Sequence, residues 1–414
     1  MAKKPSSAAA SGKPVRRGPL PMMHPGGGYI GKEEIDAVMD VLKAKSPYRF
    51  YGPHLLKMTD QFETDLKNYF GRSYALGVTS GTAALHTSMI GLGIGKGDEV
   101  ILPTYSWVAC PSAVLAAGAT PVLADVDDSL TLDPTDVERK ITNRTKAIMA
   151  VHIRGTPCNL DALTKLADDY GIVLIEDVAQ AAGASYHGKK LGTYGKVGSY
   201  SFQFNKMISA GEGGAILTDD KLVYERCVMF HDMGTPYRSW EDKSLRFEAE
   251  PIPGINYRMN EITAAIMKEQ LKKIDWIIRD IRKNKAKIKK GISDIDGIEF
   301  RRLNDPAGEA GISLVFFTKK PEQAIAFKKG LRAENIWTKS GSYPAVVYDP
   351  STNDGHIFMH WGQVFKGIHR VSKRYKQSLD LLGRAVHLDI SPLLSDEDSD
   401  DIIEAVHKVA EAVL

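Results

Sequence analysis

The chain has 414 residues, 43% of them hydrophobic and 25% charged, a composition that is ordinary for a folded protein and excludes a mostly disordered one. The formal net charge is +3, and residues 1–20 contribute five basic and no acidic side chains. The rest of the chain is therefore slightly acidic. This balance argues against a nucleic-acid partner, with binding through the basic arm as the weaker alternative.

Cysteine and hydropathy patterns exclude several further classes. Three cysteines without a CxxC spacing argue against a disulfide framework and a zinc ribbon. No apolar run approaches the roughly 18 residues of a membrane span, and the N-terminus lacks the apolar segment of a secretory signal. We expect a cytoplasmic protein without a membrane partner. His356 and His360 have HxxxH spacing but no visible third ligand, so we expect no metal site.

The first 71 residues predict an arm and two helices. Residues 1–19 are rich in Lys, Ser, Ala, Gly and Pro, which is typical of a mobile arm. Apolar residues at helical spacing predict helices over 32–44 and 55–71, the second ending at Gly71. One side of the first helix carries Ile35, Val38, Met39 and Leu42.

From residue 74 onward, short apolar runs alternate with helical stretches. The predicted strands are 74–78, 100–102, 121–124, 147–152, 172–176, 198–202 and 215–217. The predicted helices between them include 83–91, 111–117, 134–141 and 160–170. Apolar strands between amphipathic helices predict an α/β fold with a mainly parallel seven-stranded sheet, covered by helices on both faces. The last strands lack long helices between them, which favours a local meander.

The remaining chain predicts a second, smaller unit. A long helical pattern over 261–282 would bridge to it. Beyond it, a strand at 312–317 and helices at 321–334 and 396–413 indicate an α+β arrangement. We therefore expect a large domain over 20–275 and a small C-terminal domain over 276–414.

Two polar motifs follow the ends of predicted strands, where open α/β sheets bind their ligands. At Ser80-Gly81-Thr82 a strand turns into a helix, so backbone N–H groups and the Thr82 hydroxyl could bind a phosphate. An ordinary helix cap is the alternative. Trp107 follows the next strand and could stack on a planar heterocycle. A buried core tryptophan is the alternative there.

Two further motifs carry ionisable groups. Asp177 closes a buried strand, where a carboxylate is costly without a cationic partner such as a protonated ring nitrogen. Gln180 could bond the same ring, although a helix-capping aspartate is the alternative reading. Ser201 ends another strand, and Lys206 follows it in a loop closed by the glycine-rich 211–214. A desolvated Lys206 would have a lowered pKa and a nucleophilic amine, whereas most lysines are solvated surface groups.

Together these motifs are the parts needed to bind pyridoxal 5′-phosphate (PLP): a Schiff-base lysine, a partner for the pyridinium, a stacking aromatic and a phosphate cup. The sequence also resembles the DegT-type PLP-dependent sugar aminotransferases over about residues 30–410. The resemblance is carried by TSGTAAL (79–85), GDEVILPTYSWVA (97–109), VLIEDVAQAAGASYHGKKLGTYG (173–195), GSYSFQFNKMISAGEGGAILTDD (198–220) and GINYRMNEITAAI (254–266). It implies PLP fold type I, the aspartate-aminotransferase fold.

The resemblance also implies roles for individual residues. Lys206 would form the Schiff base and shuttle a proton, and Asp177 would pair with the pyridinium. The other implied cofactor contacts are Gln180 near the ring hydroxyl, Trp107 stacked on the ring, and Gly81, Thr82 and Ser201 at the phosphate. Asn256 resembles a residue that reaches the phosphate of the other subunit's cofactor, which implies a homodimer with shared active sites.

The implied reaction moves an amino group from glutamate or glutamine to a keto sugar, nucleotide-linked or free, or to a keto-cyclitol, for amino-sugar biosynthesis. A PLP-dependent sugar dehydratase or oxidase is an alternative, but the dehydratase branch carries histidine where this chain has Lys206. A non-catalytic regulatory protein with the same fold is another.

Four residues are candidates for substrate contact. Arg154 stands in HIRG where many relatives read HLYG, and could bind an acidic group or form a structural salt bridge. Arg49, Lys339 and Tyr343 are weaker candidates.

Overall fold

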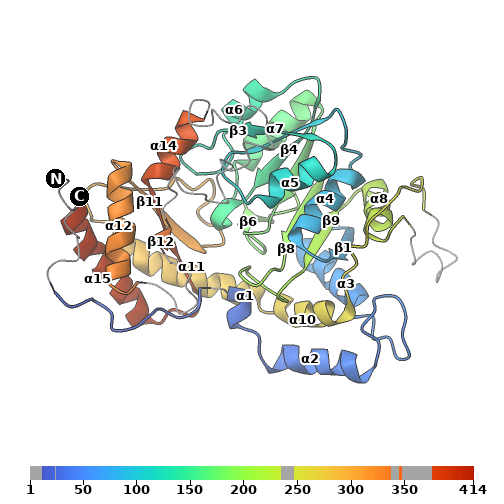
Figure 1. Cartoon of the computed structure of the whole chain (residues 1–414), viewed down its shortest axis with the longest axis horizontal. Coiled ribbons are helices and arrows are strands. Elements are labelled where there is room, and N and C mark those ends of the chain that lie inside the picture. Colours follow the sequence, from blue (N-terminus) through green and yellow to red (C-terminus); the bar gives the residue numbers. More distant parts are fainter. Residues whose placement is uncertain (1–11, 24, 235–246, 337–344, 347–374) are drawn as a thin grey trace, which may run out of the picture.

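The computed structural model describes residues 12–23, 25–234, 247–336, 345–346 and 375–414. Within these ranges the strands form a seven-stranded sheet, a four-stranded sheet and a two-stranded hairpin. Figure 1 shows the large sheet with its helices at one end of the molecule and helices α12 and α15 at the other. Helix α11 runs between the two ends.

The seven-stranded sheet confirms the predicted fold class. Its strand order is β1-β9-β8-β5-β4-β2-β3, and all strands are parallel except β9, which runs antiparallel to both neighbours. Strands β8 and β9 follow each other without a helix, so the meander is present. The strands are β1 (Tyr74–Val78), β2 (Glu99–Pro103), β3 (Thr120–Ala124), β4 (Thr145–Val151), β5 (Val173–Asp177), β8 (Val197–Ser201) and β9 (Gly214–Thr218).

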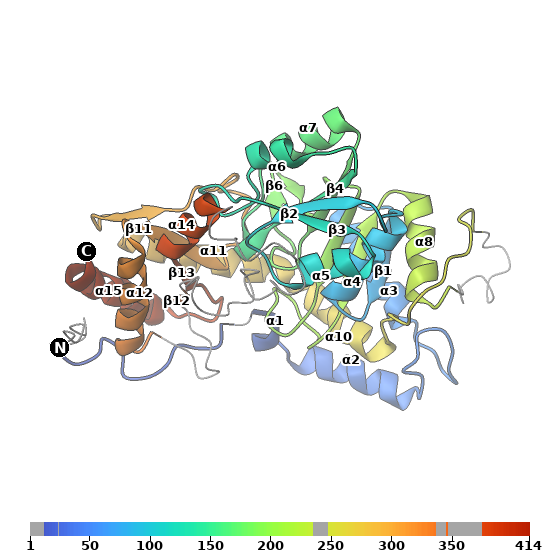
Figure 2. The ribbon, with the colours of Figure 1, turned by 45° about the horizontal axis from the view of Figure 1, so that its top comes forward.

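Helices cover both faces of this sheet, and Figure 2 shows α6 and α7 on the opposite side of β2, β3 and β4 from α4 and α5. One face packs against α4 (Gly81–Gly91), α5 (Ala109–Ala116) and α8 (Lys221–His231). The other packs against α3 (Met58–Phe70), α6 (Pro134–Lys140), α7 (Leu160–Tyr170) and α10 (Glu261–Leu271). Strand β4 shows the alternation, because Met149 faces the first group and Ile148 the second.

The four-stranded sheet is antiparallel, with the order β10-β11-β13-β12. Its strands are β10 (Ile298–Phe300), β11 (Ser313–Thr318), β12 (Ala345–Val346) and β13 (Ala385–Asp389). Its helices are α12 (Pro321–Ala333), α14 (Lys376–Arg384) and α15 (Asp396–Val413). The predicted strand and both predicted helices are present, and α14 and the other strands are additional. The domain limits at 275 and 276 stay a prediction. The described ranges hold no helix long and apolar enough to cross a membrane.

The single helix predicted over 261–282 is wrong, because the chain forms two helices there. Helix α10 ends at Leu271, and α11 runs over Ile274–Gly291. Between them, the Lys273 N–H bonds to the Gln270 carbonyl, three residues back rather than four. The Lys273 ammonium lies 2.7 Å from a carboxylate oxygen of Glu34, which is on another helix. The tightened turn and this tertiary contact redirect the chain although the apolar spacing continues.

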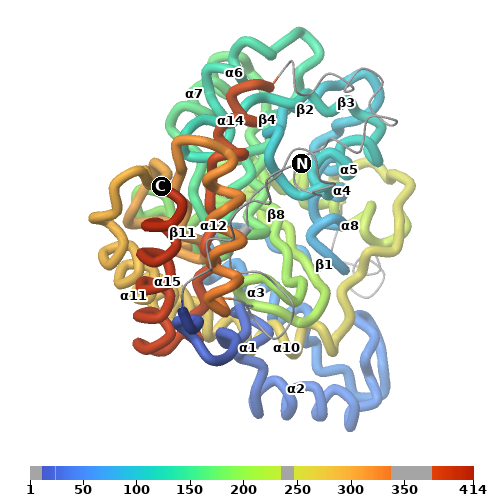
Figure 3. Tube along the Cα trace, turned by 60° about the vertical axis from the view of Figure 1, so that its left-hand side comes forward, coloured from blue at the N-terminus to red at the C-terminus, as the bar shows by residue number. Residues whose placement is uncertain are grey.

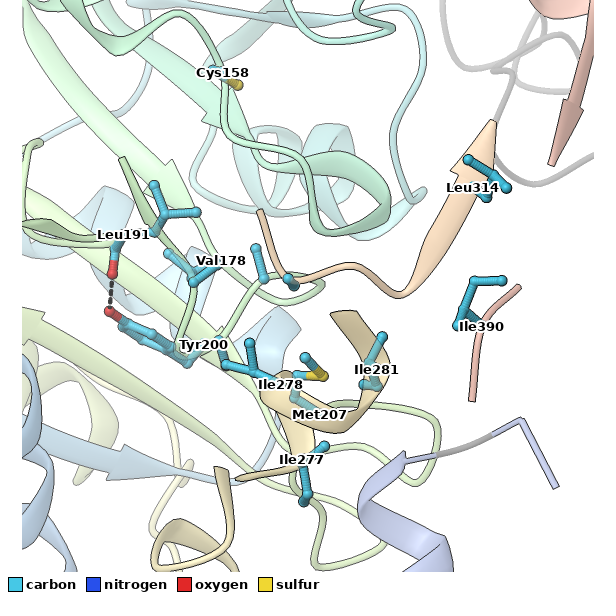
Figure 4. Close-up of a cluster of buried hydrophobic side chains, with 14 of the residues drawn as sticks. Cys158, Val178, Leu191, Tyr200, Met207, Ile277, Ile278, Ile281, Leu314 and Ile390 are labelled. Carbon is cyan, nitrogen blue, oxygen red and sulfur yellow. Dashed lines mark hydrogen bonds between the residues drawn. The ribbon is translucent and has the colours of Figure 1, made fainter. Parts of the chain in front are cut away.

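Helix α11 joins the cores of the two sheets. Figure 4 shows Ile278 and Ile281 of this helix among side chains from both parts of the molecule. Val178 and Met207 come from the loops that follow β5 and β8 of the large sheet, and Leu314 comes from β11. Val178 directly follows Asp177, and Met207 directly follows Lys206, so this core anchors the backbone of both predicted site residues.

The described part of the predicted mobile arm contacts the C-terminal helices. Arg16 forms ion pairs of 2.6 Å with both Asp398 and Asp401 of α15. The Val15 N–H donates to the Glu334 carboxylate at 2.9 Å. The first described residues and the C-terminus accordingly lie near α12 and α15 in Figure 1. Residues 12–19 are thus held in place, and residues 1–11 lie outside the described residues.

Helix α2 (Lys32–Lys43) is present as predicted, at the outer edge of the molecule in Figure 3. Its apolar side faces outward, because Ile35, Met39 and Leu42 are 59%, 44% and 49% exposed. The carboxylate of Glu34 is buried instead, and it accepts a hydrogen bond of 2.8 Å from the Gln270 side chain of α10. The helix therefore docks through the polar Glu34 together with the fully buried Val41, while those three apolar residues stay exposed.

Candidate active site

The four predicted motifs meet at one edge of the large sheet. In the sheet register, Val78 pairs with Gly214, and Gly214 pairs with Ser201. Asp177 pairs with Val151 at the end of β4. Because β1, β4, β5 and β8 are parallel, the loops that follow them emerge on the same side. This arrangement brings together three loops, at residues 80–82, 177–180 and 201–206.

The loop after β1 contacts the end of β8. Ser80 caps α4 by accepting the Ala83 N–H at 3.0 Å, which places Gly81 and Thr82 in the first turn of the helix. A Cβ atom on Gly81 would lie 2.6 Å from the Ser201 Cβ. Only glycine at position 81 lets the start of α4 lie this close to Ser201. The N–H groups at the helix N-terminus and the Ser201 hydroxyl are therefore close together. That combination suits an anion such as phosphate.

Asp177 is 5% exposed, and both of its carboxylate oxygens accept hydrogen bonds. Oδ1 accepts the Ala179 N–H at 2.9 Å. Oδ2 accepts the thiol of Cys110 at 3.1 Å. The Asp177 carbonyl also accepts the His152 N–H at 3.1 Å. The carboxylate therefore caps its own turn, as the alternative reading proposed, and is also held at the sheet edge beside α5.

Lys206 is half-buried in the loop after β8. Burial lowers the pKa of its ammonium, the nearby Asp177 carboxylate partly offsets this, and Arg154 adds to the lowering of the pKa. Its carbonyl accepts the Gly26 N–H of α1 (Pro25–Gly28) at 3.0 Å. A Cβ atom on Gly26 would lie 2.6 Å from the Ser209 nitrogen, so α1 packs directly on the lysine loop. A larger fraction of Lys206 is therefore neutral than for a solvated lysine.

Trp107 and Gln180 border this arrangement. Trp107 is 48% exposed, which excludes the buried-core alternative. Its carbonyl accepts the Cys110 N–H at 3.0 Å, so it stands at the start of the helix that contacts Asp177. The Gln180 Oε1 accepts the Arg154 N–H at 2.7 Å. The amide NH2 of Gln180 is thereby the group left to donate toward a ligand.

Arg154 forms a structural salt bridge, which is one of the two roles that the sequence allowed for it. Its guanidinium Nη1 lies 2.7 Å from Oδ1 of Asp389 at the end of β13. Its backbone has a φ of 54°, in the left-handed region that glycine favours. This residue links the large sheet to the small one close to Lys206, whose pKa it influences.

The other candidates lie elsewhere. Arg49 is 2% exposed, and its guanidinium lies 2.7 Å from the Glu63 carboxylate. It links α3 to β1, because its guanidinium and the Gly77 N–H both bond the Glu63 carboxylate, and a substrate contact by Arg49 stays a prediction. Asn256 is exposed, and its side chain accepts the Arg258 N–H at 3.4 Å. Lys339 and Tyr343, like His356 and His360, lie outside the described residues.

Sequence reasoning missed the contact between Cys110 and Asp177. The available signal was that Cys110 lies three residues after Trp107, one helical turn further on. It also missed a buried pair behind the site, in which His152 Nε2 lies 3.1 Å from a carboxylate oxygen of Glu176. The backbone N–H of Cys158 donates a hydrogen bond to His152 Nδ1 at 3.1 Å, so Nδ1 is the acceptor of the ring. The ring proton is therefore on Nε2, which donates a hydrogen bond to Glu176.

The sequence profile of the DegT/DnrJ/EryC1/StrS aminotransferase family matches residues 29–407. The chain belongs to this family. It is 32% identical to the L-glutamine:2-deoxy-scyllo-inosose aminotransferase of Streptomyces kanamyceticus over 420 aligned positions, covering 97% of this chain and 96% of that protein. It is 40% identical to the GDP-perosamine synthase of Vibrio cholerae over 226 residues, which span 54% of this chain and 59% of that protein.

The fold also matches solved structures. The crystal structure of 3-amino-5-hydroxybenzoic acid (AHBA) synthase matches with a TM-score of 0.80 and 26% identity, covering 96% of this chain and 99% of that chain. Membership of an aminotransferase family and this fold confirm the predicted transaminase class and the expected PLP fold type I. The sugar aminotransferases among the relatives agree with the predicted amino-sugar function.

Proposed function

We propose that this aminotransferase binds PLP at the described sheet edge and moves an amino group from glutamate or glutamine to a keto sugar or keto-cyclitol. The observation that carries the proposal is the placement of Lys206, whose pKa is lowered, next to the buried Asp177 carboxylate. A lysine amine and a buried acid at one site are the groups that a pyridoxal cofactor requires.

The residues present fit this cofactor. Gly81, Thr82 and Ser201 would hold its phosphate, because a glycine without Cβ leaves room between helix N-terminus and hydroxyl. Asp177 would pair with the ring nitrogen, and Trp107 would cover one face of the ring. Bound PLP would supply the electron sink for breaking the bond from the α-carbon to hydrogen. A neutral Lys206 Nζ can accept that proton and return it, while the Asp177 carboxylate would bond the ring nitrogen.

The names of two relatives support the proposed substrate class. One relative's name pairs L-glutamine with 2-deoxy-scyllo-inosose, and another's specifies GDP-perosamine. These names support glutamine or glutamate as donor and a cyclitol or nucleotide-linked sugar as acceptor. The DegT-type dehydratase alternative is disfavoured, because Lys206 occupies the position of the dehydratase histidine.

We also propose a homodimer in which Asn256 of each subunit completes the phosphate site of the other. Asn256 and the 42% exposed Ile255 lie on the surface of the subunit described here. A second apolar surface lies on the outward side of α2. We call it the α2 stripe, and it consists of Ile35, Met39 and Leu42. A partner subunit would cover this surface.

The spectrum of the protein loaded with PLP tests the cofactor and the half-reaction together. We expect a visible band that glutamate or glutamine bleaches in the wild type and in Lys96→Ala, a control at an exposed lysine. Lys206→Ala should show no such turnover. A wild-type protein that binds no chromophore would contradict the PLP site. A band that neither amino donor changes would favour the non-catalytic alternative.

Mixing two inactive variants tests the shared site. Lys206→Ala and Asn256→Ala should each lose most activity as pure dimers. In a mixed dimer, one site combines the intact Lys206 of one subunit with the intact Asn256 of the other. We therefore expect activity to return on subunit exchange, toward about a quarter of the wild-type value for an equal mixture of freely exchanging subunits. If mixing restores nothing while exchange is shown by mass spectrometry, each site belongs to one subunit.

A further inference from the structure

Cys110 is a fully buried thiol in direct contact with the carboxylate of the proposed site. It lies in the first turn of α5, and its Sγ is 3.1 Å from Asp177 Oδ2. Burial, together with the Asp177 charge, raises the pKa of this thiol well above its usual value. The sulfur therefore keeps its proton at neutral pH. It acts as a hydrogen-bond donor rather than as a nucleophile.

We propose that Cys110 is a positioning residue that acts through Asp177, orienting the carboxylate and setting how strongly it attracts the proton of a cofactor ring nitrogen. This inference rests on the proposed PLP function. Each donor to an ionised carboxylate stabilises its charge and makes it less basic. A thiol is a weaker hydrogen-bond donor than a hydroxyl. Cys110 therefore fixes the position of Oδ2 while lowering the basicity of the carboxylate only slightly.

The groups around Asp177 show why Cys110 is the side chain that orients its carboxylate. The charged groups that act on the same space are Lys206 and, through their effects on Lys206, Arg154 and Glu212. The backbone of His152 bonds the Asp177 carbonyl, while its imidazole bonds Glu176 and not Asp177. Among the described side chains, Cys110 supplies the hydrogen bond to the carboxylate, and Ala179 supplies a backbone one.

The two other cysteines provide a matched comparison. Both are buried, and both donate to backbone carbonyls: Cys158 to Val151 at 3.2 Å and Cys227 to Thr87 at 3.5 Å. Neither of these contacts involves a carboxylate. Replacing Cys227 thus removes a buried thiol of the same size without changing the donors to Asp177.

The test compares Cys110→Ala, Cys110→Ser and the control Cys227→Ala, each loaded with PLP labelled with 15N in the ring. The readout is the 15N chemical shift of the ring nitrogen at neutral pH. Removing the donor makes Asp177 more basic and draws the shared proton away from the ring. A serine hydroxyl donates more strongly, makes the carboxylate less basic and moves the shared proton further toward the ring. We expect shifts in opposite directions for Ala and Ser, and none for the control. The rate with the amino donor should change by up to about tenfold, since one unit of basicity corresponds to a factor of ten.

Shifts in the same direction for both Cys110 variants, or no shift in either, would overturn the proposal. A wild-type protein that binds no PLP would instead contradict the proposed function itself. Should a Cys110 variant not fold, the infrared S–H bands of unloaded wild-type protein and Asp177→Ala provide a second measurement. One S–H band should move toward the frequency of a free thiol when the carboxylate is removed. If all bands stay in place, the thiol does not bond Asp177 and the proposal fails.

Discussion

Helices α7 and α2 have the same kind of amphipathic spacing and opposite surroundings. In α7, Leu160 and Leu163 are fully buried in the core beneath β4 and β5. In α2, Ile35, Met39 and Leu42 point outward, and all are more than two-fifths exposed. The two helices thus differ in where their apolar side packs, although both were predicted from the same periodicity.

Polar contacts explain the orientation of α2. Its Glu34 bonds the Gly31 N–H at 2.8 Å and the Gln270 amide at 2.8 Å, and pairs with Lys273. Turning the helix to bury its apolar side would expose this acid and break all three contacts. Periodicity therefore predicts a helix and its apolar stripe, but not which surface covers that stripe. Under the proposed dimer, a second copy of the chain would cover it.

The largest effect on folding should come from the core helix. Leu163→Ala removes a fully buried side chain and leaves a cavity, so we expect a loss of about 2–5 kcal/mol in the free energy of unfolding. Urea titration followed by circular dichroism measures it. The loss should not depend on protein concentration. A loss under about 1 kcal/mol would mean that α7 packs no more tightly than α2.

Replacing the buried acid of α2 should have an intermediate effect. Glu34→Gln removes a charge partner of Lys273, and we expect a loss of about 1–3 kcal/mol at neutral pH. Its hydrogen bonds hold the pKa of Glu34 below its usual range against the opposing effect of burial. The ionised group therefore stabilises the fold above its unfolded pKa of about 4.3, and this stabilisation is lost as the pH falls through the lower folded value.

Unfolding measured from pH 7 down to pH 3 provides the check on Glu34. The difference between wild type and Glu34→Gln should shrink in acid. Glu33→Gln serves as the control, because the Glu33 side chain is 62% exposed and 3.6 Å from Lys273. A constant difference across the pH range would contradict a role for the ionised form.

The smallest effect on the subunit itself is expected at the α2 stripe. Ile35→Glu and Met39→Glu replace exposed side chains, so the free energy of unfolding of an isolated subunit should change by no more than about 0.5 kcal/mol. Self-association measured by analytical ultracentrifugation should weaken. Leu222→Glu on α8, at a position 40% exposed, is the matched control. Equal weakening by the control would show that the stripe is not the interface.

Most of the site could be predicted because each motif is local. A strand that ends in Asp177, or a turn at Gly81 before a helix, is readable within a dozen residues. The contact between Cys110 and Asp177 is different, because it joins residues 67 positions apart and depends on which strands are neighbours. The order of the strands in the sheet could not be predicted from these local motifs. The ion pair of Arg49 with Glu63 was not predicted for the same reason, since Glu63 lies on another element.

The contact of residues 13–28 with both ends of the molecule has a consequence for biosynthesis. Arg16 pairs with Asp398, and Gly26 bonds the lysine loop. During translation the first of these residues emerge long before the acids of α15 exist, because domains form from the N-terminus as the chain is made. The segment that packs on the Lys206 loop can bond Glu334 and Asn335 as soon as α12 is made, but it lacks the two Arg16 ion pairs until the last helix leaves the ribosome. Full anchoring of this segment is then a late step in maturation, and a chain released before α15 would lack the ion-pair partners of Arg16.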